Sequence, residues 1–142
     1  MTPDEFPEVF ARGWALPKPD AFLDYFLPLI SPTATFTQPM FPTAHGHQEI
    51  TRLFRGMFTL MPDMTAIPIR SSAQGDTVFI ESDCSATLGG KPVRVPVCDR
   101  FTIQQGQIIE RRSYSDPLPL TLATLRRPTA WPRVLRSRHP QP

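Results

Sequence analysis

Three polar residues near the carboxyl end of the chain, Arg112, Tyr114 and Asp116, are spaced two residues apart. In a β-strand, side chains at this spacing lie on the same face of the sheet. A guanidinium, a phenol and a carboxylate on one face either meet water or line a polar site inside a cavity. In an apolar cavity the carboxylate could act as a general acid or base, with its neighbours stabilising an enolate.

A second carboxylate, Asp99, lies within the otherwise apolar run Val93–Ile103. With a turn centred on Gln105, antiparallel pairing sets Asp99 opposite Arg112 and on the face of Asp116. Asp99 is then a pocket acid, ionised or neutral, or the partner of Arg112 in a cross-strand ion pair. For Asp116, the alternative to acid–base chemistry is a residue that caps the turn after the strand.

Two further acids, Glu81 and Asp83, precede the turn Gly89-Gly90. A two-residue loop there directs them to the face opposite Asp99, whereas a three-residue loop with a bulge directs them to the same face. Asp83 is therefore either a substrate-binding residue or part of a surface that meets solvent or a partner.

Other polar and aromatic residues are weaker candidates. Two roles are open for each aromatic candidate. Trp14 could cover a pocket as a lid or pack in the core. Tyr114 could donate a hydrogen bond to a substrate oxygen or form part of the pocket wall. His45 and His47 are too few for a metal site and are expected in a loop at the mouth of the pocket. The chain has no nucleotide-binding motif, so we expect neither a metal nor another cofactor.

The order of elements indicates an α+β fold. Helical periodicity is present at 4–16, from Asp20 to Leu27 and, most clearly, over Gly46–Met61. A short strand is expected over Ala34–Gln38. Four strands of an antiparallel meander follow: Thr65–Ser71, Thr77–Leu88, Pro92–Ile103 and Gln107–Tyr114. Helices first and strands later place the helices on one face of the sheet.

Composition bounds the protein class. The 142 residues are 40% hydrophobic and 20% charged, which is typical of one soluble globular domain. No apolar run approaches the roughly 20 residues that span a bilayer, so no membrane partner is expected. The acidic start of the chain is unlike a secretory signal, which favours the cytoplasm. The two cysteines, Cys84 and Cys98, are expected to be buried thiols.

Charge divides the chain into two parts. Residues 1–125 carry ten Lys/Arg and thirteen Asp/Glu, whereas residues 126–142 carry five Arg and no acid. We interpret 1–125 as the folded domain and 126–142 as a Pro/Arg-rich basic tail. A solubilising role is favoured over binding to nucleic acid or membrane, because Trp131 alone could supply a stacking surface.

At this level the chain resembles the nuclear transport factor 2-like superfamily, specifically its SnoaL-like branch of polyketide cyclases. Ketosteroid isomerases and limonene-epoxide hydrolases are relatives of that branch. The resemblance spans about residues 6–122 and includes Gly106, Ile108 and Glu110 and the ending Tyr114-Ser115-Asp116. It implies a cone-shaped, curved antiparallel sheet packed on three N-terminal helices, with a hydrophobic pocket. It also implies a homodimer formed through the outer face of the sheet.

The resemblance also assigns site residues. In the cyclases and epoxide hydrolases a carboxylate at the end of the last strand projects into the cone, and Asp116 matches it. Epoxide hydrolases carry an Arg-x-Asp pair on an earlier strand. Here Glu81 stands where that arginine would precede Asp83, which argues against epoxide opening. The residues expected to form the site are Asp116 and Asp99 as catalytic groups, and Tyr114, Arg112, Trp14 and Asp83 as substrate-binding groups.

The favoured function is a cofactor-independent cyclase or isomerase that acts by acid–base chemistry on an apolar carbonyl or polyketide-like molecule. Epoxide hydrolysis ranks below it. The alternatives are a non-catalytic module that binds a small hydrophobic molecule, and a dimerisation module. This fold hosts all of these functions, so only the geometry of the site can separate them.

Overall fold

The computed structural model describes residues 1–126, 132 and 136, so most of the predicted basic tail, with Trp131 and His139, lies outside the described residues. The elements are α1 (Phe6–Trp14), α2 (Asp20–Phe26), a short 3-10 helix η1 (Leu27–Leu29), β1 (Ile30–Thr37), β2 (Ala44–His45), α3 (Gly46–Leu60), β3 (Thr65–Gln74), β4 (Thr77–Leu88), β5 (Lys91–Gln104), β6 (Gln107–Ser115) and α4 (Leu118–Leu125).

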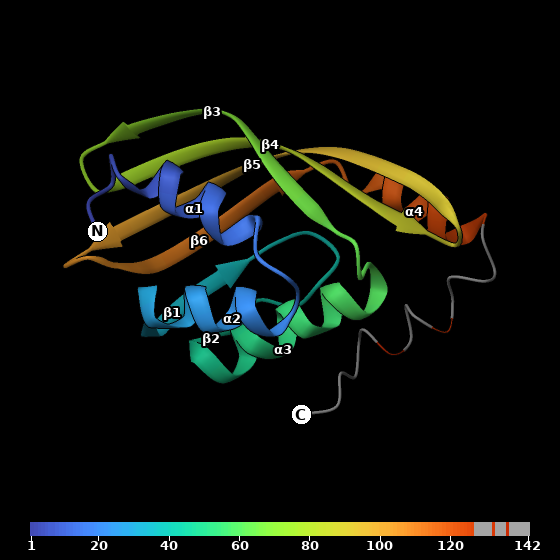
Figure 1. Ribbon diagram of the computed structural model, residues 1–142, viewed down its shortest axis with the longest axis horizontal. Helices are drawn as coiled ribbons and strands as arrows, with labels where there is room; N and C mark the ends of the chain where they lie inside the picture. Colours follow the sequence, from blue (N-terminus) through green and yellow to red (C-terminus); the bar gives the residue numbers. More distant parts are fainter. Residues whose placement is uncertain (127–131, 133–135, 137–142) are drawn as a thin grey trace.

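The sheet is strongly curved, and α1, α2 and α3 fill its concave side (Figure 1). Its strand order is β2-β1-β6-β5-β4-β3. The expected α+β cone is therefore confirmed. The sheet is mixed rather than wholly antiparallel, because β1 pairs with β6 in the parallel sense. A parallel neighbour needs a long connection, and α3 with the β3–β5 meander supplies it.

Helix α3 forms where its apolar residues recur with helical spacing. Its buried side is formed by Ile50, Leu53, Phe54, Met57, Phe58 and Leu60. The helix ends before Pro62, which cannot continue it. The predicted helix is confirmed. Asp20 is the first residue of α2, and its carboxylate pairs with Arg55 of α3 at 2.9 Å.

The turn between β4 and β5 has two residues, Gly89 and Gly90, both with positive φ. Such a turn matches the twist of a hairpin, and glycine adopts it without steric cost. The pairing that follows sets Ile80 opposite Asp99 on the inner face. Asp83 therefore lies on the outer face.

A β-bulge changes the register of the last hairpin. Next to the turn, Ile103 pairs with Ile108, as predicted from a turn centred on Gln105. Further along, β6 contains one extra residue, and Asp99 pairs with Ser113. The predicted pairing of Asp99 with Arg112 is therefore wrong. A one-residue shift exchanges the two faces of a strand, so it decides which β6 side chains enter the cone.

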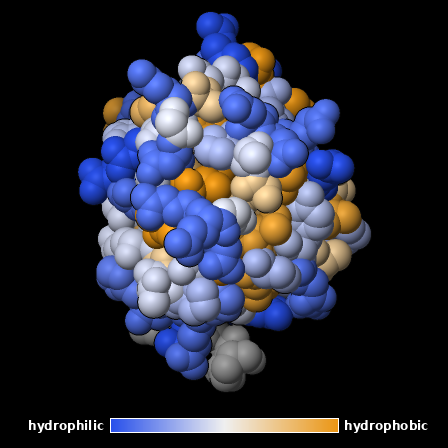
Figure 2. Space-filling model, turned by 90° about the vertical axis from the view of Figure 1, so that its left-hand side faces the viewer, coloured by the Kyte–Doolittle hydropathy of each residue, from blue (hydrophilic) through white to orange (hydrophobic). Residues whose placement is uncertain are grey.

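Helix α4 closes one end of the cone and was not predicted. Leu120 and Ala123 pack against a small apolar cluster of Leu60, Met61 and Leu88. At the opposite end, beyond the turns β3–β4 and β5–β6, hydrophilic residues predominate with hydrophobic ones between them (Figure 2). Among the described residues, no helix has the length and apolar character needed to cross a bilayer.

Candidate functional site

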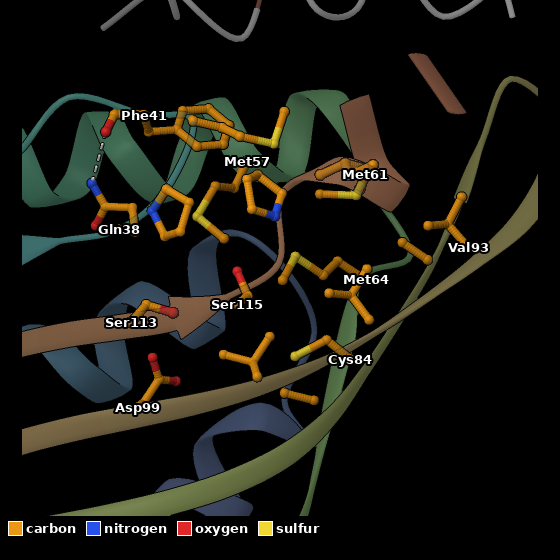
Figure 3. A pocket seen from close by; sticks show the side chains of 18 of the residues that line it. Gln38, Phe41, Met57, Met61, Met64, Cys84, Val93, Asp99, Ser113 and Ser115 are labelled. Atoms are coloured by element: carbon orange, nitrogen blue, oxygen red, sulfur yellow. Dashed lines mark hydrogen bonds between the residues drawn. The ribbon is translucent and has the colours of Figure 1, made fainter. Parts of the chain in front are cut away.

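A cavity lies between the inner face of the sheet, α3 and α4 (Figure 3). Its volume is about 100 Å³, or about 830 Å³ when all the space out to the open solvent at its mouth is counted. Exposed lining residues at Met40 and Asp116 mark the side on which it opens. Most of the wall is apolar and rich in sulfur: Met57, Met61, Met64, Ala66, Cys84, Ala86, Val93, Val95 and Val97. A predominantly apolar cavity with a few polar groups is typical of small-molecule sites.

The charged group inside this cavity is an ion pair between Asp99 of β5 and Arg111 of β6. Nη2 of Arg111 lies 2.9 Å from Oδ1 of Asp99, and Nε donates to the same oxygen at 3.1 Å. Both side chains are more than nine-tenths buried. Burying either charge alone would be costly, so each stabilises the other in the apolar interior. Asp99 therefore lies inside the pocket, in an ion pair with Arg111 rather than Arg112.

Arg111 is enclosed by aromatic rings on its other side. Its guanidinium carbon lies 5.8 Å from the ring centre of Phe36 and 5.9 Å from that of Phe54. Nη1 is buried and has no hydrogen-bond partner among the described residues. The rings offer cation–π attraction in place of hydration. The guanidinium is thus fixed at the floor of the cavity, with Nε and Nη2 committed to Asp99.

Uncharged polar residues that sequence reasoning did not single out also line the cavity, among them two serines of β6 and a glutamine. Ser113 and Ser115 of β6 follow Arg111 on the inner face, and Gln38 lies just after β1. In Figure 3 these side chains and Asp99 lie on one side of the cavity, and Met61 and Met64 lie on the other. Every second residue of a strand faces the same side, so counting along β6 would have identified the two serines as inward-facing. That count gives the correct face only if the position of the bulge is known.

Asp116 lines the cavity at its mouth and is exposed. Strand β6 ends at Ser115, so the alternation that placed Asp116 with Arg112 and Tyr114 does not extend to it. Its Oδ1 accepts a hydrogen bond of 2.9 Å from the backbone N–H of Leu118, next to the start of α4. Asp116 thus caps a turn, which was the alternative considered for it, and it also borders the cavity.

Arg112 and Tyr114 point away from the cavity, so their prediction as pocket residues is wrong. The bulge in β6 turns both to the outer face, where Tyr114 is 46% exposed. A phenol there cannot contact a ligand bound among the methionines. The inward position expected for Arg112 is taken by its neighbour Arg111.

Asp83 also faces away from the cavity, which corrects its assignment to substrate binding. The two-residue glycine turn fixes this orientation. Nε of Arg94 donates to its Oδ1 at 2.7 Å, and this hydrogen bond lowers the pKa of Asp83. Glu81, on the same face, pairs with Arg70 at 2.9 Å. Both acids belong to cross-strand ion pairs of the outer surface.

Trp14 is a core residue, which was one of the two roles considered for it, and it borders the cavity from there. It packs against the rings of Phe10, Phe22 and Phe58 and also lines the cavity. Cys84 lines the cavity too. Its burial and the nearby Asp99 carboxylate raise the pKa of its thiol to about 12. A thiol with this pKa is protonated at neutral pH and is a poor nucleophile.

The two histidines do not line the cavity, contrary to expectation. His45 is the last residue of β2, and His47 lies in the first turn of α3, where Nε2 is 2.7 Å from the carbonyl oxygen of Ile30. Within the described part of the chain, no group of three or more His, Cys, Asp or Glu residues could hold a metal ion.

Comparison with known proteins agrees with this architecture. The model of the SnoaL-like domain matches residues 6–111. The chain belongs to the SnoaL-like family. No curated protein matches this SnoaL-like chain.

Solved structures show the same fold in other proteins. A protein assigned as a SnoaL-like polyketide cyclase from Jannaschia sp. CCS1 is 20% identical, with a TM-score of 0.73 over 84% of this chain and 88% of that one. A protein with a ketosteroid isomerase-like fold from Catenulispora acidiphila DSM 44928, in complex with trimethylamine, is 20% identical, with a TM-score of 0.68 over 80% and 86%. An epoxide hydrolase of the LEH-like type from M. tuberculosis is 21% identical, with a TM-score of 0.66 over 88% and 90%.

Proposed function

We propose that this SnoaL-like protein is an acid–base enzyme that acts on a small, largely apolar carbonyl compound without a cofactor, and that Asp99 is its base. The observation that carries the proposal is a buried carboxylate on the wall of an apolar cavity. Arg111 contacts Oδ1 of Asp99, and no described residue donates a hydrogen bond to Oδ2. That oxygen is available to a ligand.

The proposed reaction begins with proton abstraction. Oδ2 of Asp99 takes a proton from the carbon next to a substrate carbonyl, and the C–H electron pair moves into an enolate. Ser113 and Ser115, on the same side of the cavity, supply hydroxyl donors to the enolate oxygen. Before the proton is transferred, the positive charge of Arg111 offsets the negative charge of Asp99. Returning the proton to another carbon gives isomerisation. Attack of the enolate carbon on a second carbonyl of the substrate gives cyclisation, and the alkoxide oxygen formed takes the proton back from Asp99.

Asp116 has a separate place in this scheme. It lies at the mouth, where solvent and the substrate's outer end meet. We assign it the exchange of protons with water and with oxygen atoms of the substrate that do not reach Asp99. This assignment keeps both predicted carboxylates in the site and gives the chemical step to the buried one.

The substrate class follows from the wall of the cavity. Methionine, valine and alanine side chains favour a hydrophobic body, and flexible methionines adapt to its outline. Membership of the SnoaL-like family and the resemblance in fold to a protein assigned as a polyketide cyclase support a carbonyl-bearing substrate. Cyclisation or isomerisation ranks above epoxide hydrolysis, since Glu81 replaces the expected arginine and faces outward.

The test is proton exchange in D₂O, which needs no knowledge of the natural product. A panel of apolar ketones and 1,3-diketones is incubated with the protein, and loss of the signal of the proton next to the carbonyl is followed by NMR. We expect exchange above the buffer rate that Asp99→Asn reduces at least about 100-fold. Asp83→Asn, on the outer face, is the matched control and should not change the rate. Equal rates in wild type and Asp99→Asn would refute the proposal.

The second candidate is a module that binds a hydrophobic molecule without transforming it. The observation that favours it is the commitment of Arg111 to Asp99, which leaves no unpaired cation among the described residues that line the cavity to stabilise an anionic intermediate. Binding of apolar ketones with no exchange in any of them would support this function instead.

We also propose that two copies of the chain pair through the outer face of the sheet. Ile67 of β3, Phe79 of β4 and Tyr114 of β6 are 62%, 44% and 46% exposed on that face. Covering these side chains would remove apolar surface from water. The family resemblance implies the same arrangement.

A further inference from the structure

The polar atoms that face the cavity are mainly hydrogen-bond acceptors. Arg111 directs Nε and Nη2 to Asp99, and its Nη1 is buried without a partner among the described residues. The cation therefore presents few donors to a ligand. Oδ2 of Asp99, in contrast, accepts no hydrogen bond from a described residue and carries negative charge.

Gln38 adds a second acceptor. Its Nε2 donates to the carbonyl oxygens of Phe41 at 3.4 Å and Pro42 at 2.7 Å (Figure 3 shows the first of these). Two carbonyl acceptors around one atom identify that atom as the nitrogen. Oε1 is then left buried, with no partner in the described part of the chain. A buried acceptor without a donor costs free energy, and a small rotation of the Gln38 side chain toward the cavity would let a ligand hydroxyl recover it.

The hydroxyls of Ser113 and Ser115 complete this side of the cavity and can donate or accept. A ligand carboxylate would meet the charge of Asp99 and the oxygen of Gln38, and it would lose its hydration on entry. A neutral hydroxyl would instead supply the donor that these acceptors lack. The methionine side of the cavity accommodates the apolar remainder of either molecule.

We infer that the cavity selects neutral ligands with an apolar body and a hydroxyl on one edge, such as phenols and enols, and excludes carboxylates. This inference deepens the proposed function, because it rests on the same cavity and names the ligand class. An enol is the neutral form of the enolate that the proposed reaction generates. Affinity for it would follow from the acceptor-rich wall.

The test compares four probes of equal ring size: naphthalene, 2-naphthol, 2-methoxynaphthalene and 2-naphthoate. Dissociation constants are measured by NMR titration of the wild-type protein at pH 7. We expect 2-naphthol to bind about tenfold more tightly than naphthalene, as for a hydrogen bond to a charged acceptor. The methyl ether cannot donate and should bind like naphthalene. 2-Naphthoate should bind at least about tenfold more weakly than 2-naphthol.

Asp99→Asn provides the second arm. Removing the carboxylate frees Arg111, so 2-naphthoate should gain at least about tenfold in affinity. Asp83→Asn, which changes the same charge on the outer face, should leave all four affinities unchanged. Spectra of each variant check that the cone is folded, and the wild-type comparison stands if Asp99→Asn does not fold.

Two results would overturn the inference: wild-type affinity for 2-naphthoate equal to that for 2-naphthol, or equal binding of 2-naphthol and its methyl ether. Binding is measured without turnover, so the two proposals can fail separately. If no proton exchange is detected but the four probes bind in the expected order, the enzyme proposal is refuted and the inferred ligand class is supported.

Discussion

Arg111 and Asp99 lie diagonally across β5 and β6, and the extra residue in β6 is what brings them together. Pairing sets Asp99 opposite Ser113 and Arg111 opposite Phe101, so the two charged residues are diagonal neighbours on the inner face. The guanidinium reaches the carboxylate at 2.9 Å on the floor of the cavity. The bulge leaves Ile109 unpaired, and without it Arg112 would occupy the inner face.

The first prediction concerns the stability of this pair. Asp99→Asn leaves a buried guanidinium without a compensating charge and should lower the free energy of unfolding by about 3–5 kcal/mol. The double variant Asp99→Leu/Arg111→Met removes both charges and should return to within about 1 kcal/mol of wild type. Urea unfolding of both variants measures these values. Additive losses in the double variant would contradict a coupled pair.

The second prediction distinguishes the role of Asp116 from that of Asp99. Asp116→Asn retains an oxygen that can accept the N–H of Leu118, so the free energy of unfolding should change by less than about 0.5 kcal/mol. Because Asp116 lies at the exposed mouth, proton exchange into a bound ketone should fall at most about tenfold, against about 100-fold or more for Asp99→Asn. The reverse order of rates would make Asp116 the base.

The third prediction concerns the thiol in the cavity wall. A rise in the pKa of Cys84 from 9.0 to about 12 lowers its thiolate fraction on the order of a thousandfold at neutral pH. In a Cys98→Ser variant, alkylation by iodoacetamide at pH 8 should be correspondingly slow, and much faster after unfolding in urea. Mass spectrometry of the modified protein gives both rates. Rapid labelling of the folded variant would show that the thiol is not buried against Asp99.

The same shift has a consequence for stability. The folded-state pKa of Cys84 lies above its unfolded value, so the folded state holds this proton more tightly. The stabilisation is fully present below pH 9 and is lost as the pH rises toward about 12. Cys84→Ala should flatten the decline of unfolding free energy over this window, whereas Cys98→Ser should flatten it less.

The fourth prediction concerns the outer face of the sheet. Phe79→Lys places a charge within the surface proposed to pair two copies, and sedimentation should show a shift from dimer to monomer.

Arg112→Ala and Tyr114→Ala leave the cavity untouched and should not change the affinity for 2-naphthol. A change in ligand affinity in either variant would mean that the outer face contributes to the site.

Much of the fold could be predicted from local patterns. Strand Thr77–Leu88 and the start of helix α3 at Gly46 agree with the sequence-based bounds, because alternation and helical periodicity are properties of neighbouring residues. The glycine turn before β5 was also recognisable. Helix α4 was missed, since its apolar residues show no amphipathic pattern and its packing depends on the distant Leu60 and Leu88.

The sequence alone was enough for the fold class and the family resemblance, and it offered Asp99 and Asp116 as candidates for one pocket. The tertiary structure alone decided which residues face into the cone. Arg111 and Arg112 are adjacent and chemically identical, and only the bulge at Ile109 selects the first. A shift of one residue reverses the faces of a strand, and nothing local in the sequence marks where an antiparallel pair takes up the extra residue.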